Sequence, residues 1–382
     1  MKPWTSNPFA QDAPTEQLLC RILRDDSPDW PALDGAGFAQ HFVELCREEG
    51  VAPLVWHHAA PTPAWPAWPV AVRQALARDA RMHTAEDMLR EQELIAVLEA
   101  FAAAGIDAVL LKGTPLAYSH YAAPGLRARC DTDLLIEPGA KDAVARLLES
   151  LGYQRPNAVS GSLVSYADSY CKMDGSVGHV LDVHWRINNA QLFAQALSWE
   201  DARGCAVPVP ALGRAARGLY PPHALLLACM HRAAHLGADG EHGNRLIWLY
   251  DIHLLANAMR ADEWREFAQL CVAKQMRALT LDAFACTHAS LNTMFPADVL
   301  EQLATPKTRE LSVAYLDASR KRLLLVDLRA LGTWRERLTL LRESCFPPAD
   351  YVMAKYQARN RSWLSWWYVR RAVEGVWKLV RF

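Results

Sequence analysis

The segment from Ile106 to Ile136, IDAVLLKGTPLAYSHYAAPGLRARCDTDLLI, decides the fold of this chain. It holds two short apolar runs, 106–111 and 131–136, with a helical stretch at 115–121 between them. A third run, VLDVHWRI at 180–187, follows a helical pattern at 141–151. Short apolar runs bounded by turn residues predict strands. The order strand, helix, strand, helix, strand therefore predicts a small α/β core.

Apolar residues recur at helical spacing on both sides of this core. Upstream and downstream, the pattern covers residues 16–24, 37–49, 70–104, 223–235, 245–259, 262–272 and 279–293, with a proline-rich break at 61–69. We therefore predict an α+β protein that is mostly α. Its expected parts are an N-terminal helical segment at 1–104, the core at 105–206 and a C-terminal helical domain at 207–382.

Composition and charge exclude several classes of protein. The 382 residues are 51% hydrophobic, which excludes a disordered chain, and they carry a net charge of -1. That balance excludes attachment to nucleic acid by bulk charge. Nine scattered cysteines without a Cys-x-x-Cys pair predict neither a disulfide framework nor a zinc site. With no apolar run of about 18 residues and no signal-like start, we expect a cytoplasmic protein without a membrane-spanning helix.

Three aspartates are the strongest candidates for a functional site. Asp131 and Asp133 are two residues apart in one predicted strand, so their side chains leave on the same side. In the third strand, Asp182, His184 and Arg186 share one face. Paired carboxylates on a buried strand are costly unless a cation neutralises them, and Mg²⁺ or Mn²⁺ suits such ligands. If the two strands are neighbours, the three carboxylates converge.

A second candidate site follows the first strand. Lys112, Gly113 and Thr114 open a helix, where backbone N–H groups favour anions and a glycine lets a phosphate come close. Lys112 would add a charge to a triphosphate. Arg127 and Arg129 precede the aspartates and are candidates for contacting phosphates or balancing the carboxylates.

Taken together, the motifs LLKGTPLA, LRARCDTDLLI and LDVHWRI resemble the uncharacterised nucleotidyltransferase family of the DNA polymerase β-like superfamily. The resemblance implies a polymerase β-like core in which Asp131 and Asp133 bind two metal ions and Asp182 binds the catalytic one. It implies an NTP donor near Lys112, Gly113, Thr114 and Arg127, with His184 and Arg186 on the acceptor side. Arg129 is a nucleotide-binding candidate from its place before the aspartates, and Arg127 is favoured because it matches the family position.

The resemblance implies Mg²⁺-dependent transfer of an NMP to an acceptor, which could be a small molecule, a peptide, a protein or an RNA end. Two alternatives remain: kinase-like transfer of a phosphoryl group at the same site, or an inactive module that binds a nucleotide or a partner. The nearly neutral charge disfavours a long nucleic acid as acceptor.

Three further features have a structural interpretation and a functional one. His231 and His235 are four residues apart on one helix, which suits buried histidines, a place near the acceptor or, less well, zinc. Asp251 is interpreted as the buried partner of an arginine such as Arg245. The tail 361–382 is interpreted as a terminal helix whose aromatic side chains complete the helical domain. Its basic, tryptophan-rich pattern leaves peripheral membrane contact as the disfavoured alternative.

Overall fold

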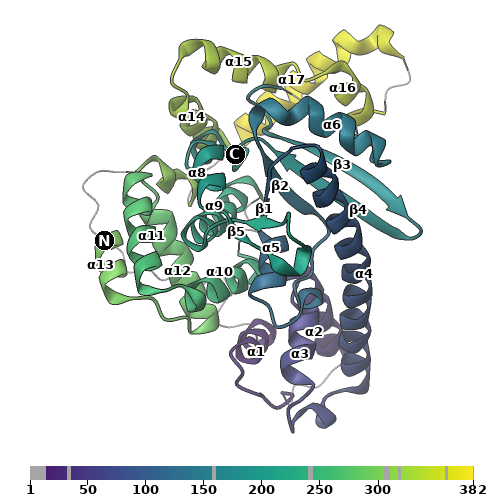
Figure 1. Ribbon diagram of the computed structural model, residues 1–382, viewed down its shortest axis with the longest axis vertical. Helices are drawn as coiled ribbons and strands as arrows, with labels where there is room; N and C mark the ends of the chain where they lie inside the picture. Colours follow the sequence, from purple (N-terminus) through teal and green to yellow (C-terminus); the bar gives the residue numbers. More distant parts are fainter. Residues whose placement is uncertain are drawn as a thin grey trace.

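The computed structural model describes residues 14–31, 36–156, 161–239, 244–304, 310–316, 320–357 and 360–381. It confirms an α+β, mostly helical protein in which helices surround one mixed six-stranded sheet (Figure 1). In that view the N-terminal helices lie at the bottom, α4 runs up the right-hand side and α14 to α17 lie at the top.

The sheet has the strand order β3-β4-β2-β1-β6-β5. Its strands are β1 (Ala108–Leu111), β2 (Thr132–Ile136), β3 (Ala167–Asp174), β4 (Val177–His184), β5 (Val207–Pro208) and β6 (Arg217–Gly218). The central strand β2 runs antiparallel to β1 and parallel to β4, and β3 pairs with β4 as an antiparallel hairpin. The strands that carry Asp133 and Asp182 are therefore neighbours.

Most of the helices coincide with the helical patterns in the sequence. Before and within the sheet they are α1 (Pro14–Leu23), α2 (Ala36–Glu48), α3 (Ala52–Ala59), α4 (Val70–Ala103), α5 (Gly113–Ser119), α6 (Lys141–Ser150), α7 (Gln191–Ala194) and α8 (Trp199–Gly204). After the sheet they are α9 (Pro221–Asp239), α10 (Leu246–Ala258), α11 (Ala261–Ala273), α12 (Arg277–Leu291), α13 (Ala297–Ala304), α14 (Arg320–Ala330), α15 (Trp334–Cys345), α16 (Ala349–Lys355) and α17 (Leu364–Arg381). Short 3₁₀ turns are η1 (Trp65–Ala67), η2 (Pro124–Leu126), η3 (Pro138–Ala140), η4 (Pro210–Leu212), η5 (Leu311–Tyr315) and η6 (Arg361–Trp363).

The long helix α4 belongs to two parts of the molecule. It starts directly after Pro69 and contains neither Gly nor Pro, so nothing interrupts it before Gly105, which has a φ of 68°. Val72 and Leu76 of its N-terminal half belong to the same apolar cluster as Phe42 of α2. Its C-terminal half packs Val97 and Phe101 into the same apolar cluster as Leu134 of β2 and Leu148 of α6.

The sheet and the main core cross the predicted part boundaries at residues 104 and 206. Strands β5 and β6 lie beyond residue 206. The larger apolar cluster joins Leu19 of α1 and Phe42 of α2 to Leu249 of α10 and Phe284 of α12. The N-terminal and C-terminal helices therefore share one core.

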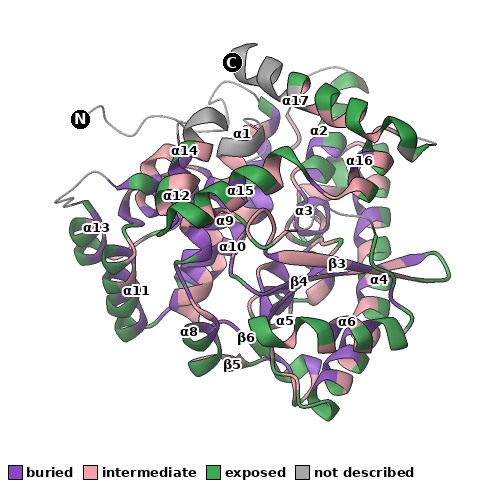
Figure 2. Ribbon diagram, turned by 90° about the horizontal axis from the view of Figure 1, so that it is seen from above, coloured by how far each residue is buried: buried purple, intermediate pink, exposed green. Residues whose placement is uncertain are grey.

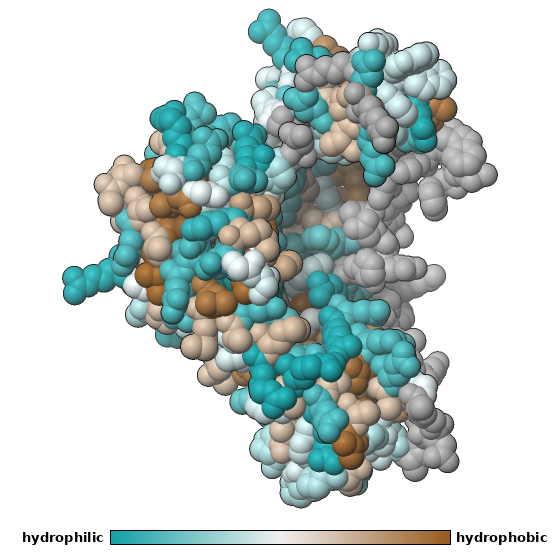
Figure 3. Space-filling model, turned by 90° about the vertical axis from the view of Figure 1, so that its right-hand side faces the viewer, coloured by the Kyte–Doolittle hydropathy of each residue, from teal (hydrophilic) through white to brown (hydrophobic). Residues whose placement is uncertain are grey.

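The helices, the cysteines and the distribution of hydrophobic residues are those of a folded protein with a buried core and no disulfide in the described ranges. None of the described helices is both long and apolar enough to cross a membrane. All nine cysteines lie in the described ranges, and each is a free thiol. Buried residues fill the centre of Figure 2, while hydrophobic side chains on the face in Figure 3 occur in patches among hydrophilic ones.

Candidate functional site

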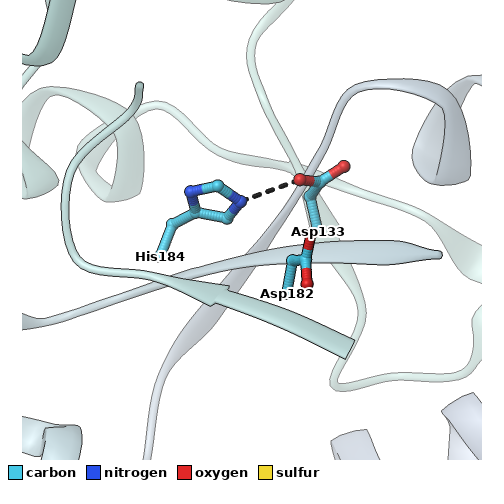
Figure 4. Close-up of side chains that lie close together, drawn as sticks. All are labelled: Asp133, Asp182 and His184. Carbon is cyan, nitrogen blue, oxygen red and sulfur yellow. Dashed lines mark hydrogen bonds and ion pairs between the residues drawn. The ribbon is translucent and has the colours of Figure 1, made fainter. Parts of the chain in front are cut away.

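The pairing of β2 with β4 brings two of the predicted aspartates together. Asp133 lies opposite Asp182 in the parallel register, and His184 is two residues further along β4, on the same face as Asp182. Ligand atoms of Asp133, Asp182 and His184 all lie within 4.8 Å of one another (Figure 4). Among the described residues, this group has a composition that could hold a metal ion.

Asp133 is an ionised carboxylate with two contacts to nitrogen atoms. Lys112 Nζ lies 2.5 Å from its Oδ1, and His184 donates from Nε2 to the same oxygen at 2.8 Å. Burial opposes ionisation, but Lys112 and His184 outweigh it and hold the pKa of Asp133 well below its usual value. The backbone of Lys112 has a φ of 54°, a value that residues other than glycine rarely adopt.

Asp131 lies directly before β2, rather than inside it as predicted. Burial raises the pKa of its carboxyl group, and repulsion from Asp133 raises it further. Asp131, Asp133 and Asp182 line the same cavity. The site thus holds three neighbouring carboxyl groups, which favours the binding of a cation.

Asp182 has a partner that the sequence did not reveal. Ser169 of β3 donates from Oγ to Asp182 Oδ1 at 2.5 Å. Ser169 stands opposite Asp182 in the hairpin register. The sequence pattern did not predict β3, so this neighbour could not be expected.

The segment around Gly113 is packed against Arg127. A side chain at Gly113 would place its Cβ 2.8 Å from the guanidinium carbon of Arg127, so it would push this guanidinium group away from its place. Thr114 is buried and lies 3.4 Å from the hydroxyl of Thr132. The predicted role of Lys112, Gly113 and Thr114 in binding nucleotide stays a prediction.

Arg127 forms a buried ion pair with Asp251 of α10. Its Nη2 lies 2.7 Å from Asp251 Oδ2, and Tyr121 donates to Oδ1 of the same carboxylate at 2.7 Å. Asp251 is therefore the buried partner of an arginine, as predicted, but the arginine is Arg127 and not Arg245. The difference arises because the fold, and not the spacing along the chain, brings residues 124 positions apart together.

The other two predicted arginines lie in different surroundings. Arg129 pairs with Asp87 of α4 at 2.5 Å and donates to the hydroxyl of Tyr118 at 2.9 Å. Arg186 follows the end of β4 and is exposed, and it is not among the described residues that line the cavity. Nucleotide binding by Arg127 and Arg129 and acceptor binding by Arg186 stay predictions.

A cavity of about 670 Å³ joins the aspartates to helices α9 and α10. His231 and His235 of α9 line it together with Trp248 of α10, and each imidazole ring centre lies 4.7 Å from the Trp248 ring. Arg245 also lines it, and Arg245 is the one of five arginines there without a carboxylate partner among the described residues. The cavity therefore has an acidic wall and a wall of rings and positive charge.

The buried position of His231 predicts a pH dependence of stability. Burial lowers the pKa of His231 well below its usual value, and repulsion from Lys112 adds to the effect. The folded protein therefore keeps this ring neutral, whereas the unfolded chain protonates it below about pH 6.5. Stability is retained above that pH and is lost as the pH falls. Between about pH 7.5 and 5.5 the free energy of unfolding of the wild type should fall. We expect that of His231→Gln to fall by about 1.4 kcal/mol less over the same range.

Urea denaturation at several pH values measures this difference. The exposed residue His41 provides the control, because His41→Gln should leave the slope of the wild type unchanged. Parallel curves for the wild type and His231→Gln would contradict the prediction.

Comparison with known proteins gives one match. The model of a family described as uncharacterised nucleotidyltransferase matches residues 38–292. This range contains all six strands and every cavity residue named above. Comparison with curated proteins and with solved structures found no match.

Proposed function

The chain belongs to the uncharacterised nucleotidyltransferase family, and we propose that it transfers an NMP from an NTP to an acceptor with the help of Mg²⁺ or Mn²⁺. The observation that carries the proposal is that Asp131, Asp133 and Asp182 line one cavity together with Lys112, and that Asp133 and Asp182 are close enough to share a metal ion. A cavity of about 670 Å³ falls in the range of small-molecule sites.

The residues present fit a divalent cation. Asp131, Asp133 and Asp182 offer carboxylate oxygens, the ligand type that Mg²⁺ prefers. The repulsion between Asp131 and Asp133 would be relieved by a bound cation. These three aspartates would hold the metal, which when bound lowers the pKa of an acceptor hydroxyl and neutralises charge on the leaving pyrophosphate.

The side chains around the aspartates would orient them and balance charge. The hydrogen bond from His184 fixes Asp133, and the hydrogen bond from Ser169 fixes Asp182. Lys112 is the positive charge closest to Asp133 and is free to exchange that contact for a triphosphate oxygen. Asp182, at the cavity wall, would receive the proton of the acceptor hydroxyl.

The part of the cavity lined by α9 and α10 would hold the organic part of a substrate. Trp248 offers a flat ring, and Arg245 lies 5.5 Å above that ring. Such a pair suits a base or another planar group. The small net charge of the whole chain makes a long nucleic acid a poor acceptor, so we propose a small molecule, a peptide, a protein or an RNA end.

Thermal unfolding tests the proposal without knowledge of the acceptor. The wild type and Asp131→Asn are heated with each of the four NTPs, with and without Mg²⁺. A ligand at about 100 times its Kd adds about 2.7 kcal/mol to the native state. We expect an Mg²⁺-dependent stabilisation by at least one NTP, lost in Asp131→Asn.

Labelled NTPs then distinguish the reactions. Transfer of label from the α-phosphate supports nucleotidyl transfer, whereas transfer from the γ-phosphate would assign a kinase-like reaction to this site. Stabilisation without any transfer would favour a binding module. Absence of stabilisation by every NTP would contradict the proposal for the free protein.

A further inference from the structure

The C-terminal helices are far more basic than the rest of the chain. Residues 320–382 contain 14 Lys and Arg against 5 Asp and Glu, a net charge of +9. Residues 1–319 contain 27 Lys and Arg against 37 Asp and Glu, a net charge of -10. The overall charge of -1 therefore hides a strong separation of charge between two parts of one molecule.

Helix α15 exposes an apolar stripe. Trp334, Leu338 and Leu341 follow each other at helical spacing and fall within about 60° of one another around the helix axis. All three are exposed, and Trp334 retains 65% of its accessible surface. Leu340, on the opposite side, is buried. The helix thus rests on the protein by one face and presents tryptophan and leucine on the other. Most of α15 is coloured as exposed in Figure 2.

Helix α17 repeats this arrangement. Trp366, Val369 and Val373 share one face and are 54–60% exposed. The neighbouring aromatic residues are half-buried. Trp367 stacks on Tyr356 at 5.1 Å, and Tyr368 lies 5.9 Å from the ring of Phe346, which directly follows α15. These aromatic side chains pack at the end of α16 and on the segment after α15, while Trp366, Val369 and Val373 remain largely exposed.

The two helices are fixed to the rest of the protein. Glu343 of α15 accepts hydrogen bonds from the backbone N–H groups of Ser162, Leu163 and Val164, which precede β3. Arg371 of α17 donates to the carbonyl oxygen of Ser344 at the end of α15. The two helices that carry the stripes are therefore attached to the folded protein and are not a loose tail.

We propose that this C-terminal apolar surface, formed by Trp334, Leu338, Leu341, Trp366, Val369 and Val373, docks on a membrane surface that contains anionic lipids. The helices would lie in the interface, with the apolar stripes among the acyl chains and the basic residues at the headgroups. Exposed Arg335 and Arg342 flank the stripe on α15. Arg370, which forms an exposed ion pair with Glu374, flanks the stripe on α17. The charge of +9 complements anionic headgroups.

The chemistry of the surface distinguishes a membrane from other occupants. A nucleic acid would match the charge and stack on tryptophan, but Leu338, Leu341 and Val373 offer it neither stacking nor hydrogen bonds. A second copy of the chain would match the apolar stripes, but it would bring two regions of +9 together. A lipid surface satisfies both the apolar and the basic side chains.

Vesicle flotation with the full chain tests the proposal. The probes are vesicles of phosphatidylcholine alone and of phosphatidylcholine with phosphatidylglycerol. We expect binding to the second kind only, weakened by salt. The pair of substitutions Leu338→Glu and Trp366→Glu should reduce the bound fraction about tenfold, and Arg342→Glu should reduce it about fivefold.

Matched controls use exposed residues on other helices. Val70 of α4 is 57% exposed, and Arg265 lies on the exposed side of α11. Val70→Glu and Arg265→Glu should leave vesicle binding unchanged, and thermal unfolding verifies that all variants are folded. Absence of binding to anionic vesicles overturns the proposal, as does binding that survives the Leu338→Glu and Trp366→Glu pair. A dimer in gel filtration that this pair dissociates would assign the surface to a second copy and would also overturn it.

Discussion

Replacing Asp133 with asparagine is expected to lower the rate of nucleotidyl transfer by about a thousandfold or more. Asp133 is the most heavily contacted of the three aspartates, since Lys112 and His184 both contact its Oδ1. Asparagine keeps the shape of the side chain but removes the negative charge, so it removes a ligand of the proposed metal site. Release of pyrophosphate from the NTP that stabilises the wild type measures the effect.

The loss of activity has to be separated from a loss of stability. Asparagine at position 133 removes the repulsion with Asp131 but also the ion pair with Lys112, so thermal unfolding without nucleotide is recorded for the variant and activity is compared at a temperature where it is folded. Asp174→Asn is the matched control, because Asp174 lies exposed at the end of β3 in the same sheet. An Asp133→Asn protein that still releases pyrophosphate in the presence of Mg²⁺ would contradict the assignment of the site.

Replacing Asp251 with alanine is expected to cost about 3–5 kcal/mol of unfolding free energy. The substitution leaves the guanidinium group of Arg127 buried without its carboxylate, and Tyr121 loses the acceptor of its hydroxyl. The cost of an unpaired buried charge exceeds the cost of breaking an exposed pair, which is about 0–1 kcal/mol. Urea denaturation of the purified variant measures the difference.

Two further variants make this measurement specific. Asp262→Ala breaks an exposed contact with Arg260 and should cost less than about 1 kcal/mol. The double substitution Arg127→Met with Asp251→Leu removes both charges and should recover most of the stability lost in Asp251→Ala. A loss below about 1 kcal/mol for Asp251→Ala would show that the pair does not stabilise the fold.

The sequence predicted the parts of the site that depend on local periodicity. Alternation along a strand placed Asp182 and His184 on one face, and the pairing of β2 with β4 makes Asp133 their neighbour. The predicted helices likewise follow a period that a short window of residues reveals. These features need no knowledge of distant residues.

The features that the sequence did not predict depend on distant contacts or on weak patterns. Strand β3, ADSYCKMD, has one fully buried side chain, Tyr170, so its apolar alternation is too weak to mark a strand, and Ser169 was missed with it. The partners of Arg127 and Arg129 lie on α10 and α4, and nothing local distinguishes Asp251 and Asp87 from other aspartates. Residue types indicated that arginines and aspartates would pair, but only the fold selects the pairs.

The double membership of α4 determines how this chain can be divided. At about 1.5 Å per residue, its 34 residues form a rod about 50 Å long that no break separates into two halves. A fragment that starts at residue 105 would lose Val97 and Phe101 from the core and would expose Leu110 and Leu134 of the sheet to water. It would also leave Arg129 without Asp87. The shortest piece that can fold around the aspartates therefore starts upstream of residue 70. The N-terminal helices and the sheet have to be expressed together.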